Sequence, residues 1–337
     1  MFSPKNLVLS IPSIQKLHAS REALRAERDV LSAKLQRRIH TYPQADSIFH
    51  HFNKSFDAIE VMERHALFEP VPHPDYVTNF LGVRIDPKFF PTILDGRAGT
   101  VEPIPIPANW HADMAEWGAV LRAVDLAEHK FTVLELGCGW GCWMNNAGVA
   151  ARRLGLEVML GGVEGDAKHI GFAVEACAAN DFASSQVTIH HGIAASRGGV
   201  ALFPHQGGED FSWGLKPVFA TGDEQEGASV QSNFDKLPII SLEYLLASRE
   251  RVDLLHMDIQ GGEADLIDNG ISNITGKVAY LVIGTHSREI EGRLFGTLLQ
   301  AGWRLEIERP CIVLLSNDTP HTLVDGIQGW RNPNLTS

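Results

Sequence analysis

The feature that most constrains the fold is an alternation of apolar strand patterns and helical patterns that begins near residue 115. Nearly continuous apolar runs separated by helical stretches are typical of a parallel sheet covered on both faces. The expected strands are residues 132–137, 157–163, 186–190, 252–258, 278–284, 302–308 and 311–316, and the expected helices are residues 142–154, 166–180, 241–249, 262–269 and 288–301. The last two strands are too close for a crossover helix, so they should pair antiparallel. The pattern predicts a doubly wound α/β fold with a mostly parallel seven-stranded sheet and a C-terminal antiparallel hairpin.

The chain before residue 115 is expected to lie outside this sheet. Residues 13–39 lack Gly and Pro and repeat a leucine at every seventh position, which predicts a helix, and a second helix is expected over residues 45–66. Polar residues fill the other heptad position, so packing on its own domain is favoured over a coiled coil that joins two copies. We expect four parts: a helical extension (1–70), an irregular linker or cover (71–114), the sheet domain (115–320) and a C-terminal tail (321–337).

Composition limits the compartment and the partners. The net charge is −12, and the acid surplus lies in the second part of the chain: residues 1–130 carry 15 basic and 16 acidic side chains, and residues 131–337 carry 14 and 25. No basic face for nucleic acid is apparent, and no apolar run approaches the roughly 20 residues of a membrane span. The four cysteines lack zinc-finger spacing and no signal peptide is evident, so we expect a cytoplasmic protein with reduced thiols.

The first strand runs into a glycine loop, "VLELGCGWGCW", over residues 133–143. Gly137, Gly139 and Gly141 allow a ligand to approach the backbone and the start of the next helix. A dinucleotide loop would have glycine where Cys142 stands, and the acidic Glu135 suits a cationic ligand better than a pyrophosphate. The loop therefore favours S-adenosylmethionine (SAM) over NAD, while a turn that needs glycine only for packing stays an alternative.

Three further residues are expected to contact this cofactor. Glu164 ends the second strand, where a carboxylate can bind ribose hydroxyls. Gly192 follows the third strand and is expected beside the adenine. Trp140, inside the glycine loop, either packs on the sulfonium or fills the core.

Polar residues at the ends of the fourth and fifth strands suggest the chemistry. His256 and Asp258 are two apart and share one side of a strand, and His286 follows the next strand. We expect His286 to act as a general base on an acceptor hydroxyl, and Asp258 to orient either His286 or the acceptor. His256 is expected nearby. Alternatively, the three would bind a divalent metal that acidifies the hydroxyl, but a metal is not favoured.

Several segments together resemble the FkbM family of SAM-dependent methyltransferases: "FTVLELGCGWGCW", "VEGD", "VDLLHMDIQGGEADLI" and "IGTHSREIEGRL". The resemblance covers roughly residues 115–316 and implies a Rossmann-like fold and O-methylation of sugars or small natural products. It implies that Glu135 and the three loop glycines bind SAM, that Glu164 binds the ribose, and that Asp258 is the strand-four acid. Many members carry Lys and Glu where this chain has His256 and Gln260, which leaves the acceptor open.

The hypothesis is therefore a SAM-dependent O-methyltransferase whose acceptor is a sugar, a glycan precursor or a small natural product. No nucleic-acid partner is expected, and a second copy could pair through the N-terminal helix. Two alternatives remain: a catalytically degenerate methyltransferase-like binding module, and an NAD-dependent oxidoreductase.

Overall fold

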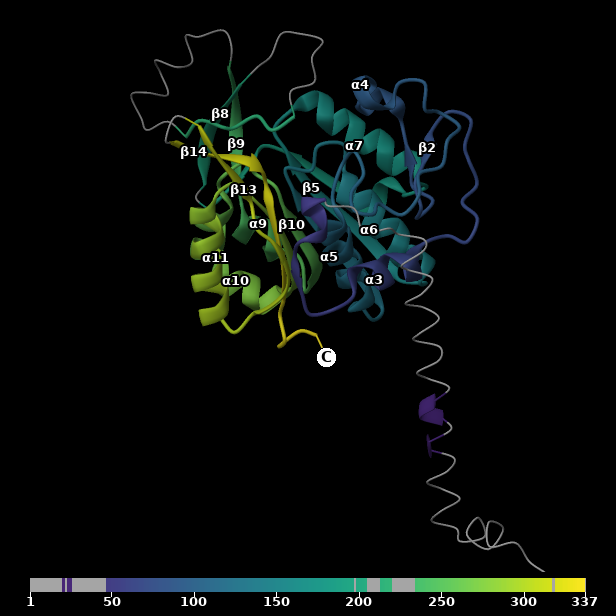
Figure 1. The fold of residues 1–337 in the computed structure, drawn as a ribbon. Helices are drawn as coiled ribbons and strands as arrows, with labels where there is room; N and C mark the ends of the chain where they lie inside the picture. The colour runs from purple at the N-terminus through teal and green to yellow at the C-terminus, as the bar shows by residue number, and fades with distance from the viewer. Residues whose placement is uncertain are drawn as a thin grey trace, which may run out of the picture. The chain divides into compact units, whose positions relative to one another are not determined.

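A computed structural model describes residues 20–21, 23–25, 47–196, 198–204, 213–219, 234–316 and 319–336 (Figure 1). The chain divides into two compact units, Met1–His50 and His51–Ser337, which are described separately. In the first unit, residues 20–21 and 23–25 are helical and exposed, and the rest of the helix predicted over 13–39 lies outside the described residues. This unit also contains the short 3-10 helix η1 (Ile48–His50).

The second unit is built on an eight-stranded sheet with the order β6-β5-β4-β10-β11-β15-β12-β1. Strands β6, β5, β4, β10 and β11 pair in parallel, and β15 pairs antiparallel with both β11 and β12. The strand bounds are β1 (Asn53–Lys54), β4 (Lys130–Leu136), β5 (Glu157–Glu164), β6 (Val187–His191), β10 (Val252–Met257), β11 (Val278–Thr285), β12 (Arg304–Arg309) and β15 (Gly326–Arg331). The predicted doubly wound, mostly parallel α/β fold is confirmed.

Helices cover both faces of the sheet, and each face has its own apolar core. One core contains residues of α5 (Met114–Asp125), α6 (Cys142–Arg153) and α7 (Ala167–Ala179). The other contains residues of α9 (Leu242–Ala247), α10 (Glu263–Lys277) and α11 (Arg288–Gln300). Figure 1 shows α10 and α11 on one side of the strands and α6 and α7 on the other.

The C-terminal strands differ from the prediction. Strand β13 (Ile312–Ser316) pairs with β14 (Thr319–Val324) in a separate hairpin, so its expected pairing with residues 302–308 is wrong. The predicted tail, residues 321–337, contains β15, which lies between two strands of the central sheet. Its sequence "GIQGWR" has glycine or a polar residue at four of six positions, so it lacks the apolar run by which the other strands were recognised.

The cover segment, residues 71–114, contains short elements and packs on the α5–α6 face. It holds a small hairpin and two short helices: β2 (Val77–Thr78), β3 (Arg84–Ile85), η2 (Pro87–Phe89) and α4 (Pro91–Leu94). Before it, the helix predicted over 45–66 is shorter than expected, because α3 (Ala58–His65) begins only after Asp57, whose carboxylate accepts the first-turn N–H groups of Ile59 and Glu60.

The Gly-rich insertion, residues 204–238, begins and ends in strands of a separate three-stranded sheet. This sheet consists of β7 (Ile193–Ala195), β8 (Gly199–Pro204) and β9 (Phe234–Ser241), and a short helix, η3 (Ser184–Gln186), precedes β6. Much of the insertion lies outside the described residues, but its segment 213–219 is described. No helix in the described ranges combines the length and apolarity that a bilayer crossing requires.

Candidate active site

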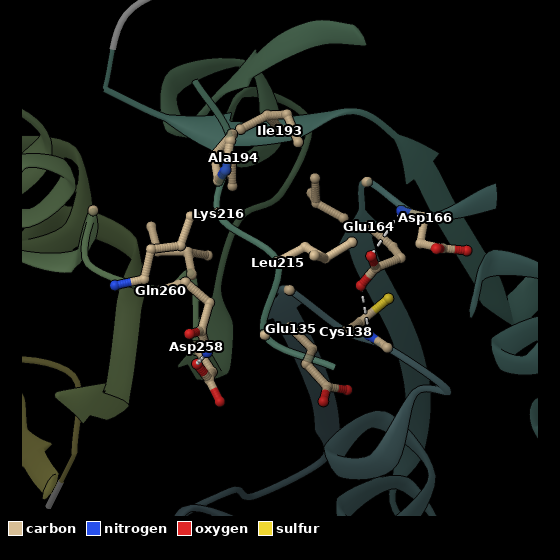
Figure 2. A pocket seen from close by; sticks show the side chains of 18 of the residues that line it. Glu135, Cys138, Glu164, Asp166, Ile193, Ala194, Leu215, Lys216, Asp258 and Gln260 are labelled. Carbon is tan, nitrogen blue, oxygen red and sulfur yellow. Dashed lines mark hydrogen bonds between the residues drawn. The ribbon is translucent and has the colours of Figure 1, made fainter. Parts of the chain in front are cut away.

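A cavity of about 1550 Å³ opens at the carboxyl ends of the parallel strands (Figure 2). It is lined by the glycine loop after β4, the ends of β5 and β10, the cover segment and residues 213–219. In Figure 2, Asp258 and Gln260 lie on one side of this cavity, and Glu164 and Asp166 lie on the other. Ligands of open α/β sheets bind at this edge, so the cavity is the candidate active site.

The glycine loop needs its glycines for two reasons. Gly137, Gly139 and Gly141 have φ angles of +73°, +52° and +74°, a region that other residues rarely adopt. In addition, a Cβ on Gly137 would lie 2.1 Å from the carbonyl oxygen of Asp258, and one on Gly139 would lie 2.8 Å from the ring of Trp213. The loop therefore packs between Asp258, which follows β10, and Trp213 of the inserted segment.

Glu135 is buried beneath this loop and binds the start of helix α6. Its carboxylate accepts the N–H of Trp143 at 3.2 Å and the N–H of Met144 at 2.8 Å. These are first-turn donors that lack partners inside the helix. Burial raises the pKa of Glu135 to about 7, although these hydrogen bonds act in the opposite direction. The residue thus fixes the loop-to-helix junction, a role that its spacing alone did not indicate.

Glu164, at the end of β5, ties the glycine loop to the start of α7. One carboxylate oxygen accepts the N–H of Gly139 at 2.7 Å, and the other accepts the N–H of Asp166 at 2.9 Å (Figure 2). Burial raises the pKa of Glu164. Each oxygen has a second lone pair, so hydroxyl donors can still bind there. Gly192 and Ile193 also line the cavity, and the N–H of Gly192 donates to the backbone carbonyl of Glu164 at 2.9 Å.

His256 lies in the floor of the cavity and is paired. Its Nε2 lies 2.9 Å from Oε1 of Glu116, and its ring packs 5.5 Å from the ring of Trp143. Burial lowers the pKa of His256, but Glu116 and Glu135 outweigh this effect and the net shift is upward. His256 is therefore held in the floor by its contact with Glu116, whose own pKa burial raises.

Asp258 and His286 lie together, as expected, and Glu263 joins them. The Nε2 of His286 lies 3.2 Å from Oδ1 of Asp258, and its Nδ1 lies 3.1 Å from Oε1 of Glu263. Burial lowers the pKa of His286, but the two carboxylates outweigh it and raise the pKa to about 10. An imidazolium has no free lone pair, so this arrangement does not suit the expected general base. Burial raises the pKa of Asp258, yet His286 outweighs this and the net shift is downward.

The structure does not bring together His256, Asp258 and His286, the three residues expected to share a metal in the alternative hypothesis. His256 pairs with Glu116, whereas potential ligand atoms of Asp258, Glu263 and His286 lie within 4.8 Å of one another. In that second group the two ring nitrogens of His286 face different carboxylates. This geometry suits a protonated imidazole between two anions better than a shared cation.

Sequence patterns missed an aromatic wall of the cavity to which the cover segment, the glycine loop and helix α6 contribute. We call it the aromatic chamber, and it consists of Phe90, Trp110, His111, Trp140 and Trp143. Ring centroids of His111 lie 5.3 Å from Trp110, 6.0 Å from Trp140 and 5.6 Å from Trp143. The sequence feature that could have indicated this wall is the run "NWH" at residues 109–111, and that run belongs to no motif.

Trp140, which the sequence left open, and Trp117 of helix α5 have different positions. Trp140 lines the cavity although it is almost fully buried, and its ring stacks on Phe89 at 5.6 Å. Trp117 lies in the core, edge-on to Trp143 at 4.8 Å. Core packing therefore describes Trp117, and Trp140 serves both the core and the cavity wall.

Comparison with known proteins defines the family. No protein-family profile matches the chain. A Jannaschia sp. (strain CCS1) protein named "Putative methyltransferase" is 42% identical over 263 residues, which cover 78% of this chain and 94% of the relative. The chain belongs to the methyltransferase family of this relative.

Solved structures with a similar fold are distant in sequence. The precorrin-6y C5,15-methyltransferase of Geobacter metallireducens GS-15 is 10% identical, with a TM-score of 0.34, over 63% of this chain and 86% of that one. The human methyltransferase 10 domain containing protein is 10% identical, with a TM-score of 0.35, over 65% of this chain and 81% of that one.

Proposed function

We propose that this protein is a SAM-dependent O-methyltransferase whose acceptor is a hydroxyl of a sugar, a glycan precursor or a small natural product. The observation that carries the proposal is one cavity that has Glu164 on one side and Asp258 on the other, and whose lining also includes the glycine loop and the aromatic chamber (Figure 2). The 42% identical relative supports methyl transfer, and the resemblance to FkbM methyltransferases supports a hydroxyl acceptor.

The residues around the glycine loop fit SAM. Gly137, Gly139 and Gly141 would let the ligand lie against the backbone, and Glu164 has lone pairs free for ribose hydroxyls. Gly192 would lie beside the adenine, with Glu135 and Trp140 near the cationic part of the ligand. When bound, SAM supplies an electrophilic methyl group on a sulfonium.

On the other side, Asp258 is the residue that would orient the acceptor. Its side chain is about half exposed in the cavity, and its carboxylate is ionised and fixed by His286. His286 is therefore a positioning residue in this proposal, and it takes no proton from the acceptor. His256 would stabilise the floor through its pair with Glu116.

The charge of the cavity favours acceptors without phosphate. Among the described residues that line it, Lys216 is the only lysine or arginine. Acidic side chains are far more numerous there: Glu116, Glu135, Glu164, Asp166, Asp258, Asp265 and Asp325. A phosphate would meet this negative surface with little compensation, which argues against nucleic acid and nucleotide-sugar acceptors.

Calorimetric titration with SAM, with its product S-adenosylhomocysteine (SAH), and with NAD tests the cofactor assignment. We expect SAM and SAH to bind and NAD not to bind. Binding of NAD without binding of SAM or SAH would indicate an oxidoreductase. If none of the three ligands binds at millimolar concentration, the protein would be a degenerate module.

Asp258→Asn tests the acceptor site. We expect SAH affinity within a few-fold of wild type and a loss of turnover of at least ~100-fold on a panel of sugars and glycan fragments, with and without chelator. A matched variant, Asn269→Ala, lines the outer cavity and should retain turnover. Full activity of Asp258→Asn would refute the role of Asp258.

A further inference from the structure

We propose that His111, from the cover segment, accepts the proton of the acceptor hydroxyl, and that the aromatic chamber around it binds the acceptor. The inference rests on the proposed function. It assigns the role of general base to a residue outside the sheet domain.

The first support is the position of His111 in the cavity. His111 lines the cavity, and its ring lies 5.6 Å from the ring of Trp143, which in turn lies 5.5 Å from the ring of His256. The ring of His111 packs among Trp110, Trp140 and Trp143, so an acceptor in the chamber would lie against it.

The second support is that the other histidines are occupied. His256 is paired with Glu116, and His286 is held between Asp258 and Glu263. His169 stacks face to face on Trp213 at 3.9 Å, beside Glu164. By contrast, the ring nitrogens of His111 make no hydrogen bond to a described residue.

The third support is that the loop holding His111 is fixed. The side-chain oxygen of Asn109 accepts the N–H of His111 at 3.0 Å and that of Ala112 at 2.9 Å. The indole N–H of Trp110 donates to Glu102 at 2.8 Å, and Asp113 binds Arg309 in a buried ion pair. Such anchoring preorganises a side chain for chemistry.

The protonation state of His111 agrees with this role. Burial lowers the pKa of His111 most, the charge of His256 adds to this effect, and Asp258 acts in the opposite direction, so that the pKa is about 4. The imidazole is thus neutral near pH 7 and has a lone pair to offer. Asp258 would stabilise the imidazolium that forms.

The transfer balances without another reagent. A C–O bond to the methyl group forms while the S–C bond breaks, and its electron pair stays on sulfur. The O–H bond breaks and its proton passes to a ring nitrogen of His111. The positive charge of the sulfonium is therefore replaced by that of an imidazolium, and the total charge of the site is unchanged.

NMR of the histidine ring Cε1–H groups tests the position of His111 without an acceptor. The probes are SAH and sinefungin, a SAM analogue that carries a charged amine where SAM carries the methyl group. Comparison with His111→Gln assigns the His111 signal. We expect His111 to be neutral at pH 7 and its signal to differ between the two complexes, because the added amine points into the chamber.

His129 is the control, since it does not line this cavity and should give the same signal in both complexes. A His111 signal that is identical in both, or that reports a charged ring at pH 7, would overturn the inference. Failure of both probes to bind would instead overturn the proposed function. The two complexes are compared in wild-type protein, the variant serves only for assignment, and His111→Asn provides it if His111→Gln does not fold.

Turnover provides the second test, on a sugar acceptor found by the panel. His111→Gln should lower kcat by at least ~100-fold while SAH affinity stays within two-fold, and added imidazole should restore part of kcat in His111→Gly. Alanine at the exposed His51 should leave kcat unchanged. Full kcat in His111→Gln would contradict the assignment.

Discussion

At the scale of single residues, the site separates groups that hold charge from groups that can exchange a proton. Glu135 and Glu164 spend hydrogen-bonding capacity on backbone N–H groups of the glycine loop and of helix α6. His256 and His286 are each bound to carboxylates, which raise the pKa of both rings. The acid-rich cavity is therefore an ordered set of pairs in which few groups titrate freely near neutral pH.

His286 makes a prediction about stability and pH. Because its folded pKa of about 10 exceeds the ordinary value of 6.5, its stabilising effect is complete below pH 6.5 and is lost as the pH rises through 10. The free energy of unfolding of wild type should thus exceed that of His286→Gln by a few kcal/mol at pH 6, and by much less at pH 10. Urea denaturation across this range measures the difference, and a constant difference would contradict the ion-pair assignment.

At the scale of elements, the glycine loop, β10 and the inserted segment form one tightly packed junction. Strand β4 delivers the loop, and Gly137 touches the backbone at Asp258 immediately after β10. This backbone contact fixes the position of the glycine loop relative to Asp258. A side chain added to the loop at Gly137 would break the contact.

Gly137→Ala tests that contact. The positive φ and a Cβ only 2.1 Å from a carbonyl oxygen should lower the free energy of unfolding by about 2 kcal/mol or more and abolish SAH binding. Gly171→Ala is the control, because this glycine is exposed in α7 and its Cβ would meet nothing within 4 Å. The control should be neutral or stabilising, and equal effects of both changes would refute the packing argument.

Elements with strong apolar patterns could be predicted from the sequence, and those without them could not. The expected strands at 132–137 and 252–258 correspond to β4 and β10, because both are buried on two faces. The chamber residue His111 escaped notice because it lies in a loop, and its importance depends on contacts with Trp140 and Trp143 that no local pattern encodes. The protonation of His286 likewise depends on Glu263, whose approach requires the folded sheet.

At the scale of the whole molecule, the final strand closes the fold. Strand β15 lies between β11 and β12, so the parallel part of the sheet and its far edge are joined through residues 326–331. Its Trp330 is fully buried in the core under α11 and meets Phe295 edge-on at 5.5 Å.

Trp330→Ala should therefore lower the free energy of unfolding by about 3–5 kcal/mol, the usual cost of truncating a buried aromatic ring. Leu315→Ala, on the exposed hairpin β13–β14, should change it by less than about 0.5 kcal/mol. Thermal or urea unfolding gives both values. A cost for Trp330→Ala as small as that for Leu315→Ala would show that the end of the chain does not belong to the sheet.

The cover segment has a consequence for how such proteins diversify. Phe90, Trp110 and His111 precede the sheet domain in the chain, whereas the glycine loop and Glu164 lie within it. On the proposed function, part of the acceptor site is encoded in a stretch of the gene separate from the cofactor site, while Trp140, Trp143 and Asp258 lie in the sheet domain. A duplicated copy can acquire a new acceptor through changes near residues 90–111 and inherit its cofactor site unaltered. Substrate range in this lineage should accordingly follow divergence of the cover segment more closely than divergence of the sheet.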